Sequence, residues 1–266
     1  MSGLQLTEAL DGVRILLCLV FFIYASWSDL EKREVSNKVW AVLAPLAFTL
    51  TFSQFYLFAP DTLLIYAFSF MVTSVVSVAL FYAGAFGGAD AKALICLSLA
   101  LPHPVHLFQP IGFVPPLFPI SVFTNAILLA ASTVLYAVGR NLLWKRRTGR
   151  QLFEGFEAQS MGRKALAFLC GYKVDIKGLE RRKHFYPLED VTVTEAGETE
   201  RRLLMFPSEE KKAEIVERIL DAREKGKLQG NVWVTPGLPL LVFITAGLII
   251  ALTLGDIIWV MLSLVL

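Results

Sequence analysis

Residues 84–92 read Gly-Ala-Phe-Gly-Gly-Ala-Asp-Ala-Lys, and this stretch organises the interpretation of the rest of the chain. The segment before it, 62–86, is long and apolar enough to be a membrane helix. Asp90 is therefore expected at the boundary of the bilayer rather than in a water-exposed loop. An acidic side chain at that depth is energetically costly, and such residues are usually functional. The stretch thus predicts a functional site around Asp90.

The composition places the chain among multi-spanning membrane proteins. Of its 266 residues, 55% are hydrophobic, and the mean hydropathy is +0.59. These values are too apolar for an ordinary soluble domain, and the apolar residues form long runs. The net charge of +2 is small, but Lys and Arg are concentrated in a few short segments, a pattern that orients membrane proteins. We expect a multi-pass protein of the cell membrane, in contact with the lipid bilayer and not with nucleic acid.

Cysteine and histidine give no indication of a metal site or an organic cofactor. The three cysteines, Cys18, Cys96 and Cys170, are isolated in the sequence, so neither a zinc site nor a disulfide framework is expected. His103 and His106 have a spacing that metals use, but no Cys or carboxylate stands beside them. We therefore predict that the protein needs no metal and no organic cofactor.

Six transmembrane helices are predicted, because each requires roughly 20 predominantly apolar residues. The expected segments are 10–28, 39–52 (extendable to 58), 62–86, 93–101, 120–144 and 238–266. In the first of them, Asp11 and Arg14 are expected to lie together at the watery end. The segment lacks the basic start and cleavage site of a signal peptide, so it is expected to be retained. Gly255-Asp256 should interrupt the last helix.

Segment 93–101 is short, and a re-entrant segment is the alternative to a crossing. A crossing is favoured because it leaves both opposite loops, near 53–61 and 102–119, without Lys or Arg, as the positive-inside rule expects. The N-terminus is then outside, and Asp29 and Asp90 both lie at the cytoplasmic side. The cations that fall on this side are Lys32, Arg33, Lys38, Lys92 and the cluster 145–147.

A polar insertion separates the last two apolar segments. Strand-like sequences at 181–193 and 201–206 flank the turn-like 195–198, and a helix is expected from Ser208 to Lys225 with Ile215 and Ile219 on its apolar face. The expected organisation is a membrane domain 1–144, a small cytoplasmic α+β domain 145–231, and a final segment 232–266. Residues 232–239 should lead back into the membrane, since Pro236 and Pro239 suit a helix start.

Asp29 and Asp90 end two different apolar segments on the same side of the membrane, so packing of those helices would bring the carboxyl groups together. At about 4 Å, two ionised groups repel by roughly 4 kcal/mol at an effective dielectric of 20. One of them should then keep its proton near neutral pH. Such a pair can hydrolyse a peptide bond. A single aspartate at a helix end is more often a solvated cap, but two on one face favour catalysis.

Three residues near the two acids are expected to support them. Arg33 and Asn37 lie one helical turn apart, and we expect them to brace the site rather than to react. Lys92 follows Asp90 by two residues and could tune its pKa or contact a substrate. The alternative for Lys92, equally supported by the sequence, is a side chain that extends along the membrane interface toward water.

The motifs around the acids resemble a known family. Asp29-x-x-x-Arg33-x-Val35-x-Asn37 and the run 87–92, Gly-Gly-Ala-Asp-Ala-Lys, resemble the type IV prepilin peptidases, which are GxGD-type aspartic membrane proteases. The insertion before the last helix and the lack of a Cys-rich N-terminal loop are similar to the archaeal branch, the preflagellin (prearchaellin) peptidases. The resemblance covers residues 10–101, with Ala89 where bacterial members have a second glycine. It implies that Asp29 and Asp90 are the catalytic pair.

The resemblance also implies a substrate and a place of action. The substrate would be preflagellin or another prepilin-like precursor, cut after a short basic leader at the cytoplasmic membrane face. A bond at the junction of leader and helix is extended and open to attack. Because Gly84, Gly87 and Gly88 leave the backbone without side chains, an extended strand could lie against it.

Two other functions remain open from the sequence. A transporter or channel could use Asp29 and Asp90 as a proton or ion relay, since acids within membranes often do so. A presenilin-like protease is the other alternative, although that family has more helices and a tyrosine where this chain has Ser28.

Acidic residues of the insertion, such as Glu189 and Asp190, could attract a basic leader. The sequence leaves the oligomeric state open.

Overall fold

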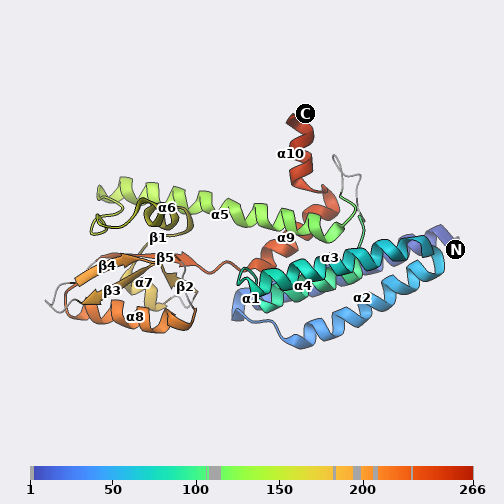
Figure 1. Ribbon diagram of the computed structural model, residues 1–266, viewed down its shortest axis with the longest axis horizontal. Coiled ribbons are helices and arrows are strands. Elements are labelled where there is room, and N and C mark those ends of the chain that lie inside the picture. Colours follow the sequence, from blue (N-terminus) through green and yellow to red (C-terminus); the bar gives the residue numbers. More distant parts are fainter. Residues whose placement is uncertain are drawn as a thin grey trace. The chain divides into compact units, whose positions relative to one another are not determined.

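The computed structural model describes residues 3–105, 107, 115–181, 184–193, 199–205, 209–228 and 230–265. The chain forms two compact units (Figure 1). Unit 1 consists of Met1–Ala130 and Pro239–Leu266, and unit 2 consists of Ala131–Leu238. Each unit has its own hydrophobic core, so they are described separately.

Unit 1 is helical and has the character of a membrane protein. Over the described residues, the helices long and apolar enough to cross a bilayer are α1 (Gly3–Lys32), α2 (Asn37–Phe58), α3 (Leu63–Tyr82, preceded by the 3-10 turn Pro60–Thr62) and α5 (Phe118–Thr148). The pair α9 (Leu240–Thr253) and α10 (Ile257–Val265) is bent by 52° and supplies a fifth span if it counts as one. The chain is therefore a membrane protein with four or five candidate spans.

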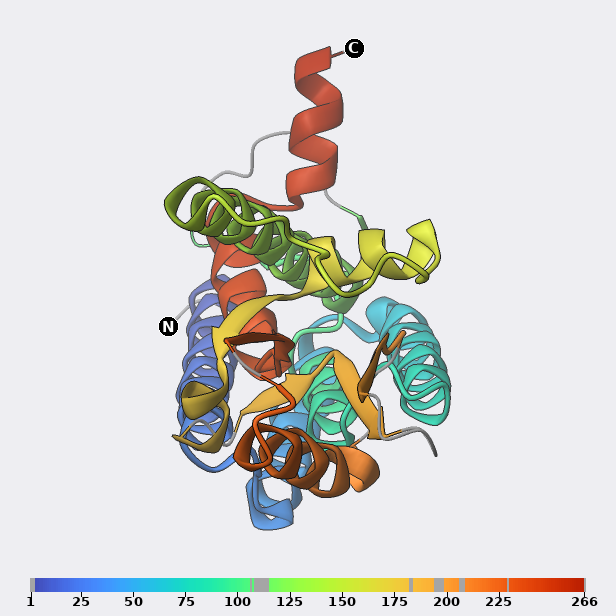
Figure 2. The same ribbon diagram turned by 90° about the vertical axis from the view of Figure 1, so that its left-hand side faces the viewer.

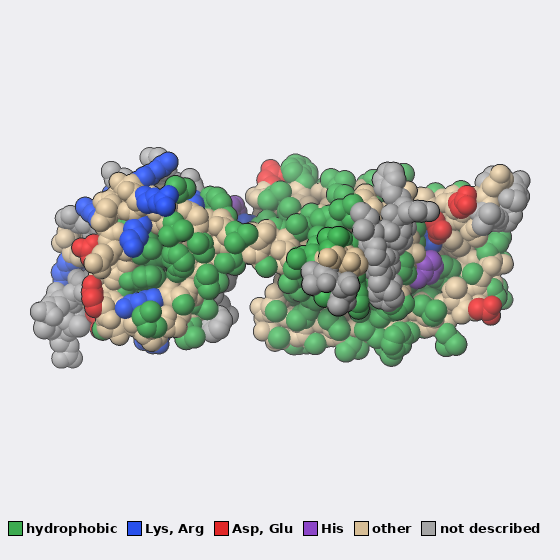
Figure 3. Space-filling model, turned by 90° about the horizontal axis from the view of Figure 1, so that it is seen from above, with side chains coloured by type: hydrophobic (Ala, Val, Ile, Leu, Met, Phe, Trp, Pro, Cys, Tyr) green, Lys and Arg blue, Asp and Glu red, His purple; other side chains and the backbone are tan. Residues whose placement is uncertain are grey.

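The outer surface of unit 1 agrees with this conclusion. Large apolar side chains face outward, and Leu64, for example, is 82% exposed. On the face shown in Figure 3, hydrophobic side chains cover most of unit 1, whereas Lys and Arg side chains gather on unit 2. Lipid is the surrounding in which such an apolar surface is stable.

Helix α4 (Gly88–Ala100) lies at the centre of unit 1, where it contacts α1, α2, α3 and α9. Its buried side chains are mostly small and include Ala93, Cys96 and Ser98, and small residues allow helix backbones to approach closely. At 13 residues, α4 is only about 20 Å long at 1.5 Å per residue. It is therefore shorter than the candidate spans around it.

The helix boundaries differ from the predicted ones at functionally relevant places. Helix α3 ends at Tyr82 instead of residue 86, because the chain turns at Gly84, whose φ of 73° suits glycine. Helix α4 begins at Gly88, five residues before the predicted start, so Asp90 lies inside its first turn. The predicted interruption at Gly255-Asp256 is confirmed, with Gly255 at φ 93°.

Asn125 fixes the bend between α9 and α10. Its side-chain Nδ2 donates to the carbonyl of Gly255 at 3.0 Å, and its Oδ1 accepts from the backbone N–H of Ile257 at 2.9 Å. These bonds satisfy backbone groups that the broken helix leaves without partners. The bend is thus held by α5 rather than left as a loose joint.

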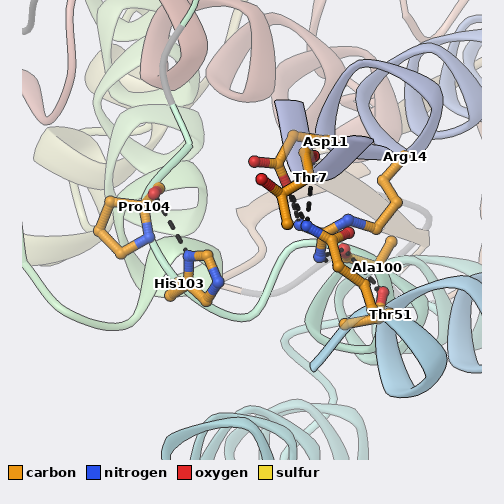
Figure 4. Close-up of polar contacts among 8 residues, drawn as sticks. Thr7, Asp11, Arg14, Thr51, Ala100, His103 and Pro104 are labelled. Carbon is orange, nitrogen blue, oxygen red and sulfur yellow. Dashed lines mark hydrogen bonds and ion pairs between the residues drawn. The ribbon is translucent and has the colours of Figure 1, made fainter. Parts of the chain in front are cut away.

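A buried polar cluster holds the C-terminal end of α4 (Figure 4). The side chain of Arg14 is 0% exposed and donates to the carbonyl of Ala100 at 3.0 Å. Thr51 of α2 donates to the same carbonyl at 3.1 Å. Arg14 also pairs with Asp11 and lies over the ring of Phe55 at 5.3 Å. The prediction that Arg14 lies at a watery helix end is wrong, because its guanidinium is needed inside the bundle to satisfy these acceptors.

Unit 2 combines two small antiparallel sheets with helices. The larger sheet has the order β1–β5–β2, and β3 pairs with β4. The strands are β1 (Tyr172–Asp175), β2 (Phe185–Pro187), β3 (Glu189–Val193), β4 (Thr199–Leu203) and β5 (Asn231–Pro236), and the helices are α6 (Met161–Cys170), α7 (Ile176–Arg181) and α8 (Glu209–Glu224). Within this unit, Figure 2 shows the strands between α8 on one side and the end of α5 on the other. The predicted α+β character is confirmed.

The core of unit 2 explains which predictions succeeded there. Ile215 and Ile219 of α8 are buried against the strands, as the helical periodicity predicted. Residues 232–239 were expected to lead into the membrane, but 232–236 instead belong to β5, the central strand of the larger sheet. An apolar run beside a membrane helix looks continuous with it, and only pairing with distant strands shows the difference. The predicted cap Ser208 and turn 195–198 lie outside the described residues.

Candidate active site

The structure brings Asp29 and Asp90 to the same end of unit 1. Asp29 lies in the last turn of α1, and Asp90 lies in the first turn of α4. The two helices contact each other, and Figure 1 shows the C-terminal end of α1 at the same end of the bundle as the N-terminal end of α4. The carboxylates are close enough for the charge of Asp29 to act on Asp90. Both side chains are partly exposed and thus accessible.

Gly87 positions the carboxylate of Asp90. The backbone N–H of Gly87, the residue before α4, donates to Oδ2 of Asp90 at 2.9 Å. This hydrogen bond is part of a capping box at the start of α4. The carboxylate is also stabilised by the positive end of the helix dipole. A Cβ on Gly87 would lie 3.0 Å from the same Oδ2, tighter than ordinary contacts. Glycine at 87 therefore leaves room for the carboxylate.

The other glycines of the break have different roles. Gly84 has a φ of 73° and no atom near the position of a Cβ, so it serves the turn after α3. A Cβ on Gly88 would meet the ring of Phe81 at 3.6 Å, an ordinary contact. Of the three predicted glycines, Gly87 is the one that contacts the carboxylate of Asp90. The distance of three residues between Gly87 and Asp90 is the spacing of a capping box, a sequence signal that could have indicated this contact.

The turn after Asp29 is also well defined. Arg33 has a φ of 55°, and its backbone N–H donates to the carbonyl of Asp29 at 3.0 Å. A left-handed residue in this position is a common way to end a helix. The hydroxyl of Ser28 donates to the carbonyl of Glu34 at 2.8 Å and closes the turn. The charge of Arg33 is also close enough to act on the carboxylate of Asp29.

Lys92 and Asn37 meet each other. Nζ of Lys92 donates to Oδ1 of Asn37 at 2.7 Å, which links the first turn of α4 to the first turn of α2. Both side chains are exposed. The pair thus joins two helices beside the acids, and α4 is held at this end as well as at Ala100.

One sequence-based idea finds no support in the geometry. Glu189, considered as an attractor for a basic leader, is 0% exposed, and Asp190 pairs with Arg218 at 2.9 Å. His103 stacks on the ring of Phe55 at 5.0 Å, and His106 lies outside the described residues. Within the described part of the chain, no three His, Cys, Asp or Glu side chains form a group that could hold a metal ion.

Comparison with known proteins accounts for most of the sequence. Residues 16–137, which include both acids, match the model of the type IV leader peptidase family. Residues 163–257 match the model of the archaeal peptidase A24 C-terminus, type II. Over residues 16–137 the chain is similar to the type IV leader peptidase family. Its members are peptidases, and the family resemblance of the motifs is thereby confirmed.

Two relatives resemble the chain along most of its length. The preflagellin peptidase of Methanococcus maripaludis is 24% identical over 250 residues, which are 88% of this chain and 91% of that protein. The preflagellin peptidase of Methanococcus voltae is 26% identical over 249 residues, 90% of this chain and 93% of that protein. The similarity therefore includes unit 2, which the motifs around the acids do not reach.

Proposed function

We propose that the chain is an aspartic endopeptidase that removes the short basic leader from preflagellin or other prepilin-like precursors, with Asp29 and Asp90 as its catalytic pair. The observation that carries the proposal is that these two acids, far apart in sequence, lie at the same end of two contacting helices, inside the segment that matches the type IV leader peptidase family. The names of the two relatives support the choice of substrate.

The proposed mechanism follows from the proximity of two carboxyl groups. Because like charges at short range resist simultaneous ionisation, the pair shares one proton. The ionised member accepts a proton from water while the water oxygen attacks the scissile carbonyl carbon, and the protonated member donates a hydrogen bond to the carbonyl oxygen. Transfer of a proton to the amide nitrogen then allows the C–N bond to break.

The glycines beside Asp90 support a substrate in extended form. Gly87 and Gly88 carry no side chains, so a peptide strand can approach the backbone next to the carboxylate. The junction between a leader and the following helix supplies such a strand. The Lys92–Asn37 hydrogen bond supports a bracing role for these residues, and Arg33 is proposed to hold the end of α1 in place.

We further propose six crossings, with α4 as a short one and α9 with α10 as another. In this topology the N-terminus is outside, and both acids and the sheets of unit 2, including β5, are at the cytoplasmic face of the cell membrane. The concentration of Lys and Arg near the cytoplasmic ends supports this orientation.

The direct test is leader removal in membranes that contain a leader-bearing precursor. We expect Asp29→Asn and Asp90→Asn each to lower cleavage roughly a thousandfold or more, and the double variant to be no worse, because the residues act as a unit. Asp61→Asn is the matched control, since Asp61 is exposed in the turn before α3. Cleavage that persists in either single variant would contradict the proposal. If these variants lost ion flux and not cleavage, the alternative function as a transporter would be favoured.

A further inference from the structure

Unit 2 contains a cavity of about 250 Å³ that is lined by three cations, Arg150, Lys173 and Arg201. Glu154 is the acidic residue of its lining, and the ring of Trp144 forms part of the wall. Both proposed catalytic aspartates belong to unit 1, so the leader peptidase mechanism leaves these cations without a role.

Lys173 is the unusual member of this group. It is 8% exposed, and within the described residues no hydrogen bond or ion pair satisfies its ammonium group. Its Nζ lies 4.6 Å from the centre of the Trp144 ring and 5.8 Å from that of Trp233. Burial lowers its pKa from the ordinary 10.5 to about 8. A buried cation held between aromatic rings and open to a cavity is suited to an anion that enters from solution.

The acid that could have neutralised Lys173 is engaged elsewhere. Glu189 is fully buried and accepts from Nη2 of Arg201 at 2.7 and 3.0 Å and from the backbone N–H of Trp233 at 3.0 Å. These bonds fix the guanidinium of Arg201. Its Nη1 lies 3.8 Å from where a Cβ on Gly155, a residue of the cavity wall, would stand. Glu189 therefore orients Arg201 toward the cavity and is not free to pair with Lys173.

Arg150 completes the group at the exposed rim. Its Nη1 lies 3.9 Å from the position of a Cβ on Gly230, whose φ of 88° suits glycine. The cavity lining carries three positive charges against the negative charge of Glu154, and the buried Glu189 compensates Arg201 from behind, so one net positive charge remains. Arg150 comes from the segment before α6, Lys173 from β1 and Arg201 from β4.

We propose that this cavity binds a phosphate group. Phosphate offers acceptor oxygens to several cations at once, and guanidinium groups bind it through two parallel hydrogen bonds. The ammonium of Lys173 would gain the acceptor that the fold does not provide, so binding would offset part of its cost of burial. The group can belong to free phosphate or to the headgroup of an anionic lipid, since both present the same oxygens.

The test uses the reactivity of Lys173 in the full-length protein. At pH 8 about half of its amine is uncharged, given its pKa of about 8, so an acylating reagent followed by mass spectrometry reports its accessibility. We expect inorganic phosphate to slow acylation of Lys173 severalfold, but not that of the exposed Lys225, which follows α8. Sodium chloride of the same ionic strength should not protect. In a parallel arm, vesicles with phosphatidylglycerol are compared with vesicles of phosphatidylcholine alone.

Arg150→Gln is the decisive variant, because its exposed side chain can be changed with little effect on folding. Loss of one charge-assisted contact should weaken protection of Lys173 at least about tenfold, whereas the matched control Lys225→Met should leave it unchanged. Protection by free phosphate identifies a soluble ligand, and protection by phosphatidylglycerol vesicles alone identifies a lipid headgroup. Equal protection by chloride, no protection in either arm, or undiminished protection in Arg150→Gln would overturn the proposal.

Discussion

At the residue scale, Gly87 shows how a missing side chain shapes the proposed active site. Its backbone conformation, with φ −73° and ψ 158°, is open to any residue. What excludes a side chain is the carboxylate of Asp90, 3.0 Å from the position of a Cβ. Glycine is therefore needed at 87 to leave room for the carboxylate of Asp90, whereas at 84 it is needed because the backbone has a positive φ.

This contrast predicts opposite effects for two alanine substitutions. In Gly87→Ala the new methyl group displaces the carboxylate of Asp90, so leader cleavage should fall about tenfold or more while the melting temperature changes little. In Gly84→Ala the left-handed conformation should cost about 1 kcal/mol of stability, with the cleavage rate of the folded enzyme retained. Thermal unfolding and cleavage assays on both variants check this. A reversal of the two effects would contradict the assigned roles.

A second prediction concerns pH and Lys173. Its folded pKa of about 8 lies below the ordinary 10.5, so between these values the unfolded chain binds more protons than the folded one. The free energy of unfolding should therefore rise with pH from about 8 to about 10.5 and level off above. Denaturation of wild type and Lys173→Met across this range measures the contribution as a difference. An identical pH slope in both proteins would count against a buried, charged Lys173.

Sequence alone could indicate some of these residues and not others. Asp29 and Asp90 were detectable because acids are rare beside long apolar runs. The cavity around Lys173 was not, because it depends on the register that places Lys173 of β1 opposite Trp233 of β5. Such pairing between distant segments leaves no periodic signal in the chain.

At the element scale, α4 is held at both ends. Lys92 joins its start to α2 through Asn37, and Arg14 of α1 binds the carbonyl of its last residue, Ala100. The position of Asp90 along the bundle therefore depends on contacts at the far end of the same helix.

Removal of the Arg14 guanidinium should disturb this arrangement. In Arg14→Met, Asp11 and the carbonyl of Ala100 lose a buried partner, which should cost about 3 to 5 kcal/mol. Arg14→Lys keeps the charge but not the planar set of donors, so its loss should be intermediate. Thermal unfolding of the membrane protein in detergent measures both. Unchanged stability in Arg14→Met would show that the cluster does not hold α4.

The elements themselves were predictable to different degrees. Apolar runs located α1, α2, α3 and α5, because a spanning helix needs many such residues together. The start of α4 was missed, since a glycine-rich stretch looks like a loop until the capping bond of Asp90 is seen. Strand β5 was missed because its buried residues Val232, Trp233 and Val234 have the composition of a membrane entry.

At the scale of the whole molecule, the proposed orientation can be tested with a native cysteine. Cys170 in unit 2 is exposed, whereas Cys18 and Cys96 in unit 1 are buried. If unit 2 is cytoplasmic, a membrane-impermeant thiol reagent should label Cys170 in inverted membrane vesicles and not in right-side-out ones. Cys170→Ser is the control and should remain unlabelled. Labelling of sealed right-side-out vesicles would reverse the proposed topology.

Charge distribution allowed a prediction of sidedness, and the polar insertion allowed a prediction of a separate α+β module. The point where α5 passes from one unit to the other, between Ala130 and Ala131, was not predictable. That helix is continuous, and nothing in its local sequence marks where its packing partners change.

The shortness of α4 bears on the supply of water, the second reactant of peptide hydrolysis. A helix of 13 residues is about 20 Å long, and a hydrocarbon layer is about 30 Å thick. The proposed crossing by α4 therefore requires the lipid to thin or the aqueous phase to indent by roughly 10 Å. An indentation at the Gly88 end of α4 would hydrate Asp90 and keep it at the depth at which a membrane-embedded substrate presents its cleavage site.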